Sequence, residues 1–289
     1  MTSAEMNTGT LYVVATPIGN LADLTRRAEN ILASVEIVAA EDTRRTAVLL
    51  DHIGHRAPQL LSYHEHNKKR MTLDLLERLE RGHDVALVSD AGTPLVNDPG
   101  AELVAAATSS GIKVVPVPGA SAITAALSVC PFSCFPFTYV GFLPSKQSQR
   151  KKLLQERLEH KEALVFFEAP HRVEDTLRDL VDLTERRLLV GRELTKQYET
   201  IQVGTASEIV EQGVEARGEF VLIVELGEPV DLDVAEYRRV LKILLEDLSP
   251  SQAARTAASI LKVKKSALYD LAQEMAKEMA KEKSDVRKG

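Results

Sequence analysis

The first half of the chain alternates short apolar runs, rich in β-branched residues, with longer stretches in which apolar residues recur at helical spacing. Strands separated by helices in this way predict a largely parallel sheet with helices on both faces. The expected helices are residues 21–35, 43–51, 71–82 and about 100–110. The expected strands are residues 10–16, 35–42, 59–67, 84–92 and 112–119.

The pattern changes at residues 130–137 (CPFSCFPF), where prolines and aromatic residues predict a domain junction. Helices are then expected at about 147–160 and 171–183, and strands at 137–143, 163–170, 187–194, 199–204 and 219–226. Because several of these strands follow one another without a helix, the second sheet is expected to be mixed. We therefore predict an α/β protein with two α/β domains, residues 1–135 and 136–229.

The remaining residues, 230–289, have a wholly helical pattern. Helices are expected at 237–248, 249–261 and 266–282, with Ser249 as N-cap and Pro250 as the first helical residue of the second. Helix, tight turn and helix outline a helix-turn-helix-like domain. A small helical lid or a dimerisation segment fits the same pattern equally well.

The composition and charge of the chain limit the functions that it can have. The formal net charge is −6, and residues 230–289 carry 12 basic and 10 acidic side chains, so the negative charge belongs to the rest of the chain. An acidic body argues against indiscriminate nucleic-acid binding but leaves room for local basic patches. We find neither a signal peptide nor an apolar stretch that could span a membrane, so a cytoplasmic protein is expected. Cys130 and Cys134 are interpreted as free thiols.

Loops rich in glycine, proline and small residues follow three strands of the first half: ATPIGNL, SDAGTPLVNDPG and PVPGASA. Glycine lets the backbone come close to a ligand, and proline stiffens the loop. In a parallel α/β sheet such strand ends gather ligands, so three of them together predict a binding site. Neither G-x-G-x-x-G nor G-x-x-x-x-G-K-[ST] occurs, which argues against a dinucleotide fold, the common glycine-rich methyltransferase loop and a P-loop.

Residues 10–46 resemble the start of the bacterial ribosomal RNA ribose 2′-O-methyltransferases that modify a cytidine of the small subunit. The motifs SYHEHN, SDAGTPLVNDPG, PVPGASA, GFLPSK, EAPHR, GRELTK and GEFVLIV continue the resemblance in the same order, over residues 10–227. That family belongs to the tetrapyrrole (corrin/porphyrin) methylase superfamily. The resemblance implies S-adenosylmethionine bound in a cleft between the two α/β domains, methyl transfer to the ribose of a cytidine in 16S rRNA, and a homodimer.

The resemblance also implies which residues line the cofactor pocket, mainly through their backbone groups. They are Pro17, Asp90, Ala91, Gly92, Leu95, Ser121, Ala122, Phe142 and Ala169.

A ribose hydroxyl is a weak nucleophile, so a general base would help the transfer. Glu41 and Glu168 are the candidates, with Asp42 and His171 also near strand ends. The apolar neighbours of Glu168 predict that burial raises its pKa. For each of these side chains taken singly, helix capping or ion pairing is the simpler interpretation.

Basic residues within motifs at strand ends are the expected contacts to RNA phosphates. They are Arg44, Lys146, Arg150, Lys151, Arg192 and Lys196, with a further contact possible at Lys262, Lys264 and Lys265 in the tail. His64 and His66 are expected on one strand face, but no third ligand with suitable spacing accompanies them, so no metal site is predicted.

Two other functions fit parts of the same pattern. One is a small-molecule tetrapyrrole methylase, which the basic loops and basic tail disfavour. The other is a non-catalytic DNA-binding regulator that senses a ligand in its body and binds DNA through the C-terminal helices.

Overall fold

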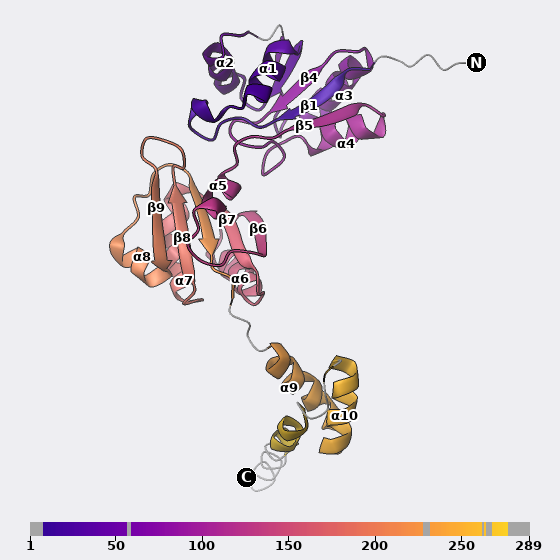
Figure 1. Ribbon diagram of the computed structural model, residues 1–289, viewed down its shortest axis with the longest axis vertical. Coiled ribbons are helices and arrows are strands. Elements are labelled where there is room, and N and C mark those ends of the chain that lie inside the picture. Colours follow the sequence, from indigo (N-terminus) through magenta and orange to yellow (C-terminus); the bar gives the residue numbers. More distant parts are fainter. Residues whose placement is uncertain (1–7, 57–58, 228–231, 262, 264–267, 277–289) are drawn as a thin grey trace, which may run out of the picture. The chain divides into compact units, whose positions relative to one another are not determined.

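The computed structural model describes residues 8–56, 59–227, 232–261, 263 and 268–276 (Figure 1). Contacts divide the chain into two compact units, Met1–Leu226 and Gly227–Gly289. Each unit is described by itself.

The first sheet of the larger unit has five strands, all parallel, in the order β3-β2-β4-β1-β5. The strands are β1 (Thr10–Val14), β2 (Ile37–Ala40), β3 (Gln59–Ser62), β4 (Val85–Val88) and β5 (Lys113–Val117). All residues of β2 and β4 are buried. Such continuous apolar strands are typical of a parallel sheet covered on both faces.

Two pairs of helices cover this sheet (Figure 1). The helices α1 (Arg26–Ser34) and α2 (Thr43–His52) pack on the face that carries Val38, and α3 (Lys68–Glu80) and α4 (Ala101–Ser109) pack on the face that carries Ile37. Because successive strand residues point to opposite faces, the alternation in β2 supplies both cores. The predicted three-layer α/β arrangement is therefore observed.

One predicted helix is interrupted. Residues 21–35 form a short 3₁₀ helix, η1 (Leu21–Asp23), followed by α1, which begins only at Arg26. The break comes at Thr25, which is extended and accepts a hydrogen bond from the Ala28 amide at 3.1 Å. A threonine hydroxyl that caps a helix start leaves its own residue outside the helix.

A predicted strand is shorter than expected, and this changes the position of two histidines. Strand β3 ends at Ser62, where the Asn67 side chain donates to the Ser62 carbonyl at 2.9 Å and accepts from the His64 amide at 2.8 Å. His64 and His66 therefore lie in the turn before α3, with their rings edge to face at 5.9 Å. The prediction that both lie on one strand face is wrong, because Asn67 closes a turn there.

The second sheet has the strand order β6-β7-β10-β8-β9. β6 and β7 are parallel and the other neighbours are antiparallel, so the sheet is mixed, as predicted. The strands are β6 (Phe137–Phe142), β7 (Ala163–Glu168), β8 (Arg187–Arg192), β9 (Thr200–Thr205) and β10 (Phe220–Val224).

The helices α6 (Gln147–Leu158) and α7 (Val173–Val181) pack on one face of the second sheet together with α8 (Ala206–Gln212), and α5 (Ala122–Ser128) packs on the other. A short 3₁₀ helix, η2 (Pro170–Arg172), precedes α7. Helix α8 was not predicted, although the sequence carries its signal: Thr205 and Glu208 form a complete capping box.

The smaller unit contains α9 (Leu232–Leu244), α10 (Pro250–Leu261) and a further helical stretch at residues 268–276. Leu241, Ala254, Leu268 and Ala272 form its core. Pro250 is the first residue of α10, as expected. Lys262, Lys264 and Lys265 lie outside the described residues. Among the described residues we find no helix that is both long and apolar enough to cross a membrane.

Candidate active site

The three loops that follow β1, β4 and β5 are tied together by hydrogen bonds. The Thr16 and Gly92 backbones bond to each other in both directions, at 2.9 and 3.0 Å. The Thr93 hydroxyl donates to the Ala120 carbonyl at 3.3 Å. Since these strands are neighbours in a parallel sheet, their carboxyl ends meet at one edge. The loops therefore form one connected wall.

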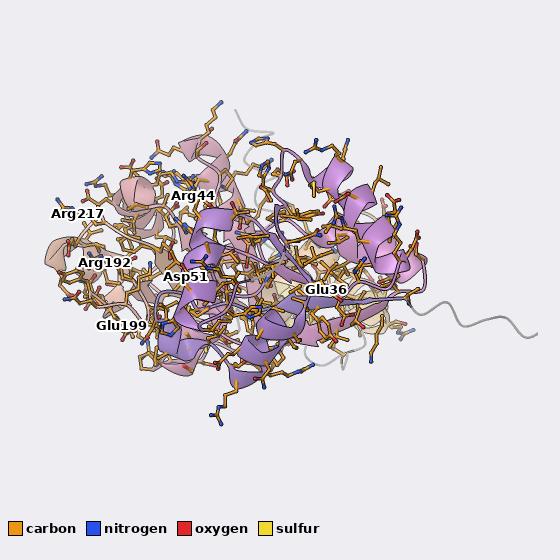
Figure 2. All side chains as sticks on the ribbon, turned by 90° about the horizontal axis from the view of Figure 1, so that it is seen from above. Glu36, Arg44, Asp51, Arg192, Glu199 and Arg217 are labelled. Carbon is orange, nitrogen blue, oxygen red and sulfur yellow. The ribbon has the colours of Figure 1, made fainter. Side chains whose placement is uncertain are left out.

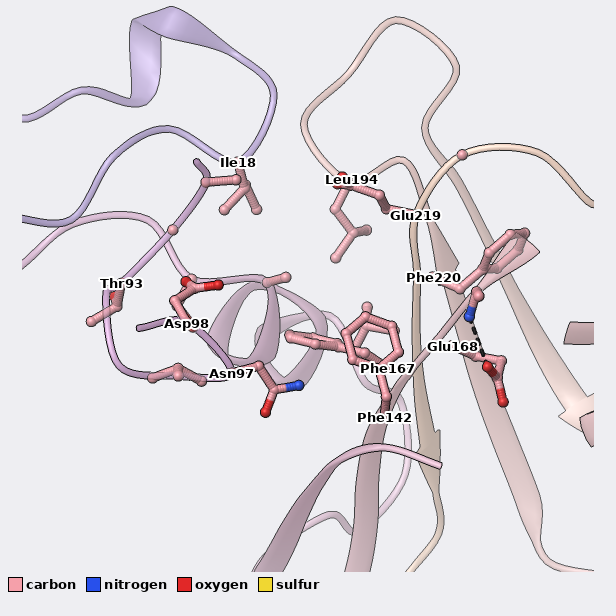
Figure 3. A pocket seen from close by; sticks show the side chains of 18 of the residues that line it. Ile18, Thr93, Asn97, Asp98, Phe142, Phe167, Glu168, Leu194, Glu219 and Phe220 are labelled. Carbon is pink, nitrogen blue, oxygen red and sulfur yellow. Dashed lines mark hydrogen bonds between the residues drawn. The ribbon is translucent and has the colours of Figure 1, made fainter. Parts of the chain in front are cut away.

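A cavity of about 350 Å³ lies between this wall and the second sheet (Figure 3). On the first side Ile18, Thr93, Asn97 and Asp98 line it, and Leu194 lies across from them. The size is that of a small-molecule site. The other side is completed by residues at the ends of strands of the second sheet, which include Phe142, Phe167, Ala169, Glu219 and Phe220.

Glycine and alanine residues in the wall leave space in the cavity beside it. Gly92 has a φ of +78°, a conformation that L side chains rarely adopt, and a Cβ there would lie 3.3 Å from Ile18 Cγ2. Ala91, Ala122 and Ala169 also line the cavity. Small side chains of this kind leave room for a ligand to approach the backbone.

Aromatic rings form the apolar part of the cavity. The Phe167 ring packs edge to face against Tyr139 at 5.2 Å and against Phe142 at 5.7 Å between ring centroids. Phe142 is 54% exposed. A ring so exposed at the rim can contact a flat group bound in the cavity.

Two strained loops flank the cavity. Asn97, after β4, has a φ of +69°, and Glu193 and Thr195, after β8, have φ values of +51° and +69°. Non-glycine residues in this region cost free energy and persist only where the surroundings hold them, a situation common at functional sites.

An ion-paired lysine holds the second loop. The Lys196 ammonium lies 2.8 Å from Glu193 Oε1 and 3.0 Å from Glu219 Oε2. The Lys196 stem fills the space beside Gly19, where a Cβ would overlap it. Lys196 thus links a loop of the second sheet to the loop after β1.

Two carboxyl groups near the wall, those of Asp98 and Glu41, have raised pKa values. Burial, together with the negative charge of Glu41, raises the pKa of Asp98 to about 6. Burial also raises the pKa of Glu41, although the Asp90 amide donates to its carboxylate at 3.3 Å. Asp98 was not among the predicted site residues. Its position in the SDAGTPLVNDPG motif is the feature of the sequence that could have indicated a role at the site.

Comparison with known proteins identifies the family. The model of the Tetrapyrrole (Corrin/Porphyrin) Methylases matches residues 10–210, and that of the RsmI C-terminal HTH domain matches residues 231–276. The chain belongs to the tetrapyrrole methylase family. It is therefore a methyltransferase, and its C-terminal unit carries a helix-turn-helix domain.

Similar sequences place this methylase within one branch of the family. It is 45% identical to the "Ribosomal RNA small subunit methyltransferase I" of Xylella fastidiosa over 90% of this chain and 98% of that protein. It is 43% identical to the protein of the same name from Escherichia coli O157:H7, over 94% and 97% of the two chains. The methylase thus also belongs to the small-subunit methyltransferase I family.

Solved structures share the fold. A uroporphyrin-III-C-methyltransferase from Thermus thermophilus superposes with a TM-score of 0.55 at 20% identity, over 75% of this chain and 94% of that chain. A diphthine synthase superposes with a TM-score of 0.59 at 14% identity, over 76% and 92%. These likenesses support the two-domain α/β fold predicted from the sequence.

Six of the nine residues expected in the cofactor pocket of the methylase line the cavity: Ala91, Gly92, Ser121, Ala122, Phe142 and Ala169. Pro17 and Asp90 instead line a smaller cavity of about 120 Å³, together with Arg45. Leu95 lines neither, because its side chain packs against the core of the first sheet. Ile18, Asn97 and Leu194 line the larger cavity and were not expected there.

Glu168 has a structural role. One carboxylate oxygen lies 2.6 Å from Arg172 and accepts from the Ala169 amide at 2.7 Å, and the other accepts from the Thr176 hydroxyl at 2.7 Å. With both oxygens engaged, Glu168 anchors the start of α7. Glu168 also lines the cavity, but this geometry favours the capping and ion-pairing interpretation over a role as the base.

Glu41 lines neither cavity. It accepts a hydrogen bond from the Asp90 amide at 3.3 Å, and its negative charge raises the pKa of Asp98. Asp42 caps α2 and is bound by Arg44, which lowers the pKa of the Asp42 carboxyl well below its usual range.

Two of the residues expected to contact RNA have buried guanidinium groups. Arg150 is 3% exposed, with Nε and a terminal nitrogen each 2.7 Å from Asp179 Oδ2. Arg192 is 6% exposed and donates to the Arg217 and Tyr198 carbonyls while it pairs with Glu215 at 3.0 Å (Figure 2). Neither side chain can reach a phosphate without losing these partners.

The other four expected RNA contacts are accessible to different degrees. Arg44 is 88% exposed near the start of α2 (Figure 2). Lys146 is exposed at the N-cap position of α6. Lys151 pairs with Asp182 at 2.7 Å, and Lys196 is held by its two glutamates.

The remaining chemistry-bearing side chains form no obvious centre. Cys130 and Cys134 are free thiols. Within the described ranges no three His, Cys, Asp or Glu residues are grouped so that they could hold a metal ion.

Proposed function

We propose that this methylase transfers a methyl group from S-adenosylmethionine to the ribose 2′-hydroxyl of a cytidine in small-subunit (16S) rRNA. The observation that carries the proposal is the cavity between two sheets in a chain that is 43–45% identical, over at least 90% of its length, to ribosomal RNA small subunit methyltransferases I. The names of these relatives favour rRNA over a tetrapyrrole as the acceptor.

The cavity fits the methyl donor. S-adenosylmethionine supplies a methyl group on a positively charged sulfur, which needs no further activation. Ala91, Gly92, Ser121, Ala122, Phe142 and Ala169 would hold it, and Pro17 and Asp90 act from the neighbouring side of the same loops. Ile18, Phe167 and Leu194 supply apolar walls that exclude water, so that positioning provides most of the rate.

The test of the function is a direct transfer assay. The purified protein is given a methyl-labelled donor with small ribosomal subunits, with free rRNA and with a precorrin-type acceptor. We expect label only in rRNA, at one ribose that mass mapping of nuclease fragments identifies as that of a cytidine. Label in the precorrin alone would contradict the proposal and favour the small-molecule alternative.

RNA is proposed to reach the cavity past Lys146, with Arg44, Lys151 and Lys196 as further contacts. Lys146 is exposed at the N-cap of α6, four residues after the rim residue Phe142, and no carboxylate pairs with it among the described residues. An unpaired cation can contact a phosphate at a low cost in free energy, because no existing ion pair has to break.

Substitution of Lys146 by alanine should weaken rRNA binding at every sequence to a similar degree. The slope of log affinity against log salt should fall by about one, as for the loss of one phosphate contact. The matched control is Lys152→Ala on the same helix, because Lys152 is 78% exposed and pairs with Glu156 at 3.8 Å. Equal salt slopes for the two variants would remove Lys146 from the RNA surface.

The C-terminal helix-turn-helix unit is proposed to add backbone contacts to RNA rather than to act in catalysis. Its described basic residues include Arg239 and Arg255. A chain truncated after Leu226 should keep its affinity for S-adenosylmethionine in calorimetry and lose affinity for rRNA. Loss of sequence-specific DNA binding on truncation would instead favour the regulator alternative.

The protein is further proposed to be a cytoplasmic homodimer. Val129 at the end of α5, Phe135 and the first residue of β6, Phe137, expose apolar surface, with Phe135 79% exposed. A surface of this kind favours association. Sedimentation analysis should give twice the chain mass, and substitution of Phe135 by aspartate should shift it toward the mass of one chain.

A further inference from the structure

Asp98 lies in a loop whose backbone conformation is restricted on both sides of the residue. It lies between Asn97, whose φ is +69°, and Pro99, whose ring restricts the backbone. Asn97 is pressed against β6, where a Cβ on Gly141 would lie 2.8 Å from Asn97 Oδ1. Figure 3 shows the Asp98 side chain among the groups that line the cavity, on the same side as Ile18.

The charges around Asp98 differ from those around Glu168. Glu41 and Asp90 act on it from β2 and β4, and both are negative. Ser89 offers a hydroxyl within hydrogen-bonding reach. Over the described residues no Lys, Arg or His pairs with Asp98, and the nearby Arg45 is engaged by Asp90 at 3.5 Å.

On the side of the second sheet, the group that faces Asp98 is Tyr139 of β6. The Tyr139 hydroxyl is buried without a hydrogen-bond partner among the described groups, and burial together with the charge of Asp98 raises the pKa of Tyr139 to about 12. Tyr139 therefore stays neutral near neutral pH, and it does not itself line the cavity.

We propose that Asp98 is the general base of the methyl transfer, and this rests on the proposed function. The ribose oxygen forms its new bond to the methyl carbon while the carbon–sulfur bond breaks and its electron pair returns to sulfur. The hydroxyl proton passes to a carboxylate oxygen of Asp98, which later releases it to water. Three carboxylates line the cavity: Glu168 has both oxygens engaged, Glu219 pairs with Lys196 at 3.0 Å, and Asp98 has no cation partner among the described residues.

The sign of the pH dependence follows from this role. Asp98 must be ionised to accept a proton, and its pKa is raised to about 6 by burial and by Glu41. The value of kcat/KM should therefore be constant above neutral pH and fall with unit slope as the pH drops through about 6. Removal of the Glu41 charge in Glu41→Gln should move this limb to lower pH.

The decisive variant is Asp98→Asn, which keeps the shape and removes the basic carboxylate. Single-turnover methyl transfer to small ribosomal subunits should fall about 100- to 10,000-fold. Calorimetric affinity for S-adenosylmethionine and the melting temperature should stay near those of the wild type. The control is Asp51→Asn, since Asp51 is an exposed carboxylate of α2 that pairs with Arg56, and its rate should be unchanged.

Three outcomes would overturn the proposal. They are an Asp98→Asn rate within about threefold of the wild type, a pH limb that persists in Asp98→Asn, and a loss of donor affinity that accounts for the whole rate loss. In the last case Asp98 would be a cofactor-binding residue. Absence of methyl transfer by the wild-type protein to any rRNA would overturn the proposed function itself, and calorimetry of the donor would separate that failure from a failure at Asp98.

Discussion

Gly92→Val is expected to abolish measurable binding of S-adenosylmethionine while the protein stays folded. Gly92 lines the cavity with a φ of +78°, and its added Cβ would lie 3.3 Å from Ile18 Cγ2. The branched side chain would fill the wall where the backbone is open to the cofactor. We expect a loss in affinity of at least about 100-fold, equivalent to about 2.7 kcal/mol. Calorimetric titration of the purified variant measures it.

The control for Gly92→Val must carry the same backbone strain without touching the cavity. Gly213, at the end of α8, has the same φ of +78° and no heavy atom within 4 Å of an added Cβ. Gly213→Val should lower the melting temperature to a similar extent and bind the donor normally. Normal donor affinity in Gly92→Val would show that the pocket lies elsewhere.

Arg150→Ala is expected to destabilise the fold and to leave RNA affinity unchanged. It would leave the carboxylate of Asp179, 1% exposed, without its main cation. Removal of one member of a buried ion pair typically costs about 3–5 kcal/mol, because the other charge stays buried. Gln147 and Lys151 also contact Asp179, so we expect a loss of about 3 kcal/mol, measured by urea unfolding.

Lys152→Ala is the control here too, because it removes an exposed cation from the same helix. Its pair with Glu156 is long and solvated, so the free energy of unfolding should change by less than about 1 kcal/mol. RNA binding measured at a temperature where Arg150→Ala is still folded should match the wild type. A stable Arg150→Ala protein with weakened RNA binding would restore the interpretation of Arg150 as an RNA contact.

Much of the fold could be predicted from apolar periodicity. The strands at 37–40 and 85–88 are continuous apolar runs, and the capped helix starts at Asp42 and Pro250 stand out in the sequence. The predicted and observed elements differ where a local side-chain hydrogen bond overrides the apolar periodicity. Thr25 capped a helix that began later than expected, Asn67 closed a turn where a strand was expected, and a capping box started the short helix α8.

The site was only partly predictable. Loop composition located the wall around Gly92 and Ser121, because glycine and small residues act through the backbone wherever the chain runs. The positions of the charged side chains could not be predicted from the sequence in the same way. Arg150 lies within a basic run that is typical of a solvated surface, and only the approach of Asp179, 29 residues away in the chain, buries it.

The succession of strands and helices along the chain, the mixed character of the second sheet and the glycine-rich loops of the first were determined by the sequence alone, since each depends on residues close together in the chain. Tertiary structure decided which carboxylates line the cavity, which of them are paired and which cations are free. In the sequence Asp98, Glu41 and Glu168 are all carboxylates, and their neighbours in the fold distinguish them. Burial and ion pairing arise between distant segments, so these properties follow only from the folded chain.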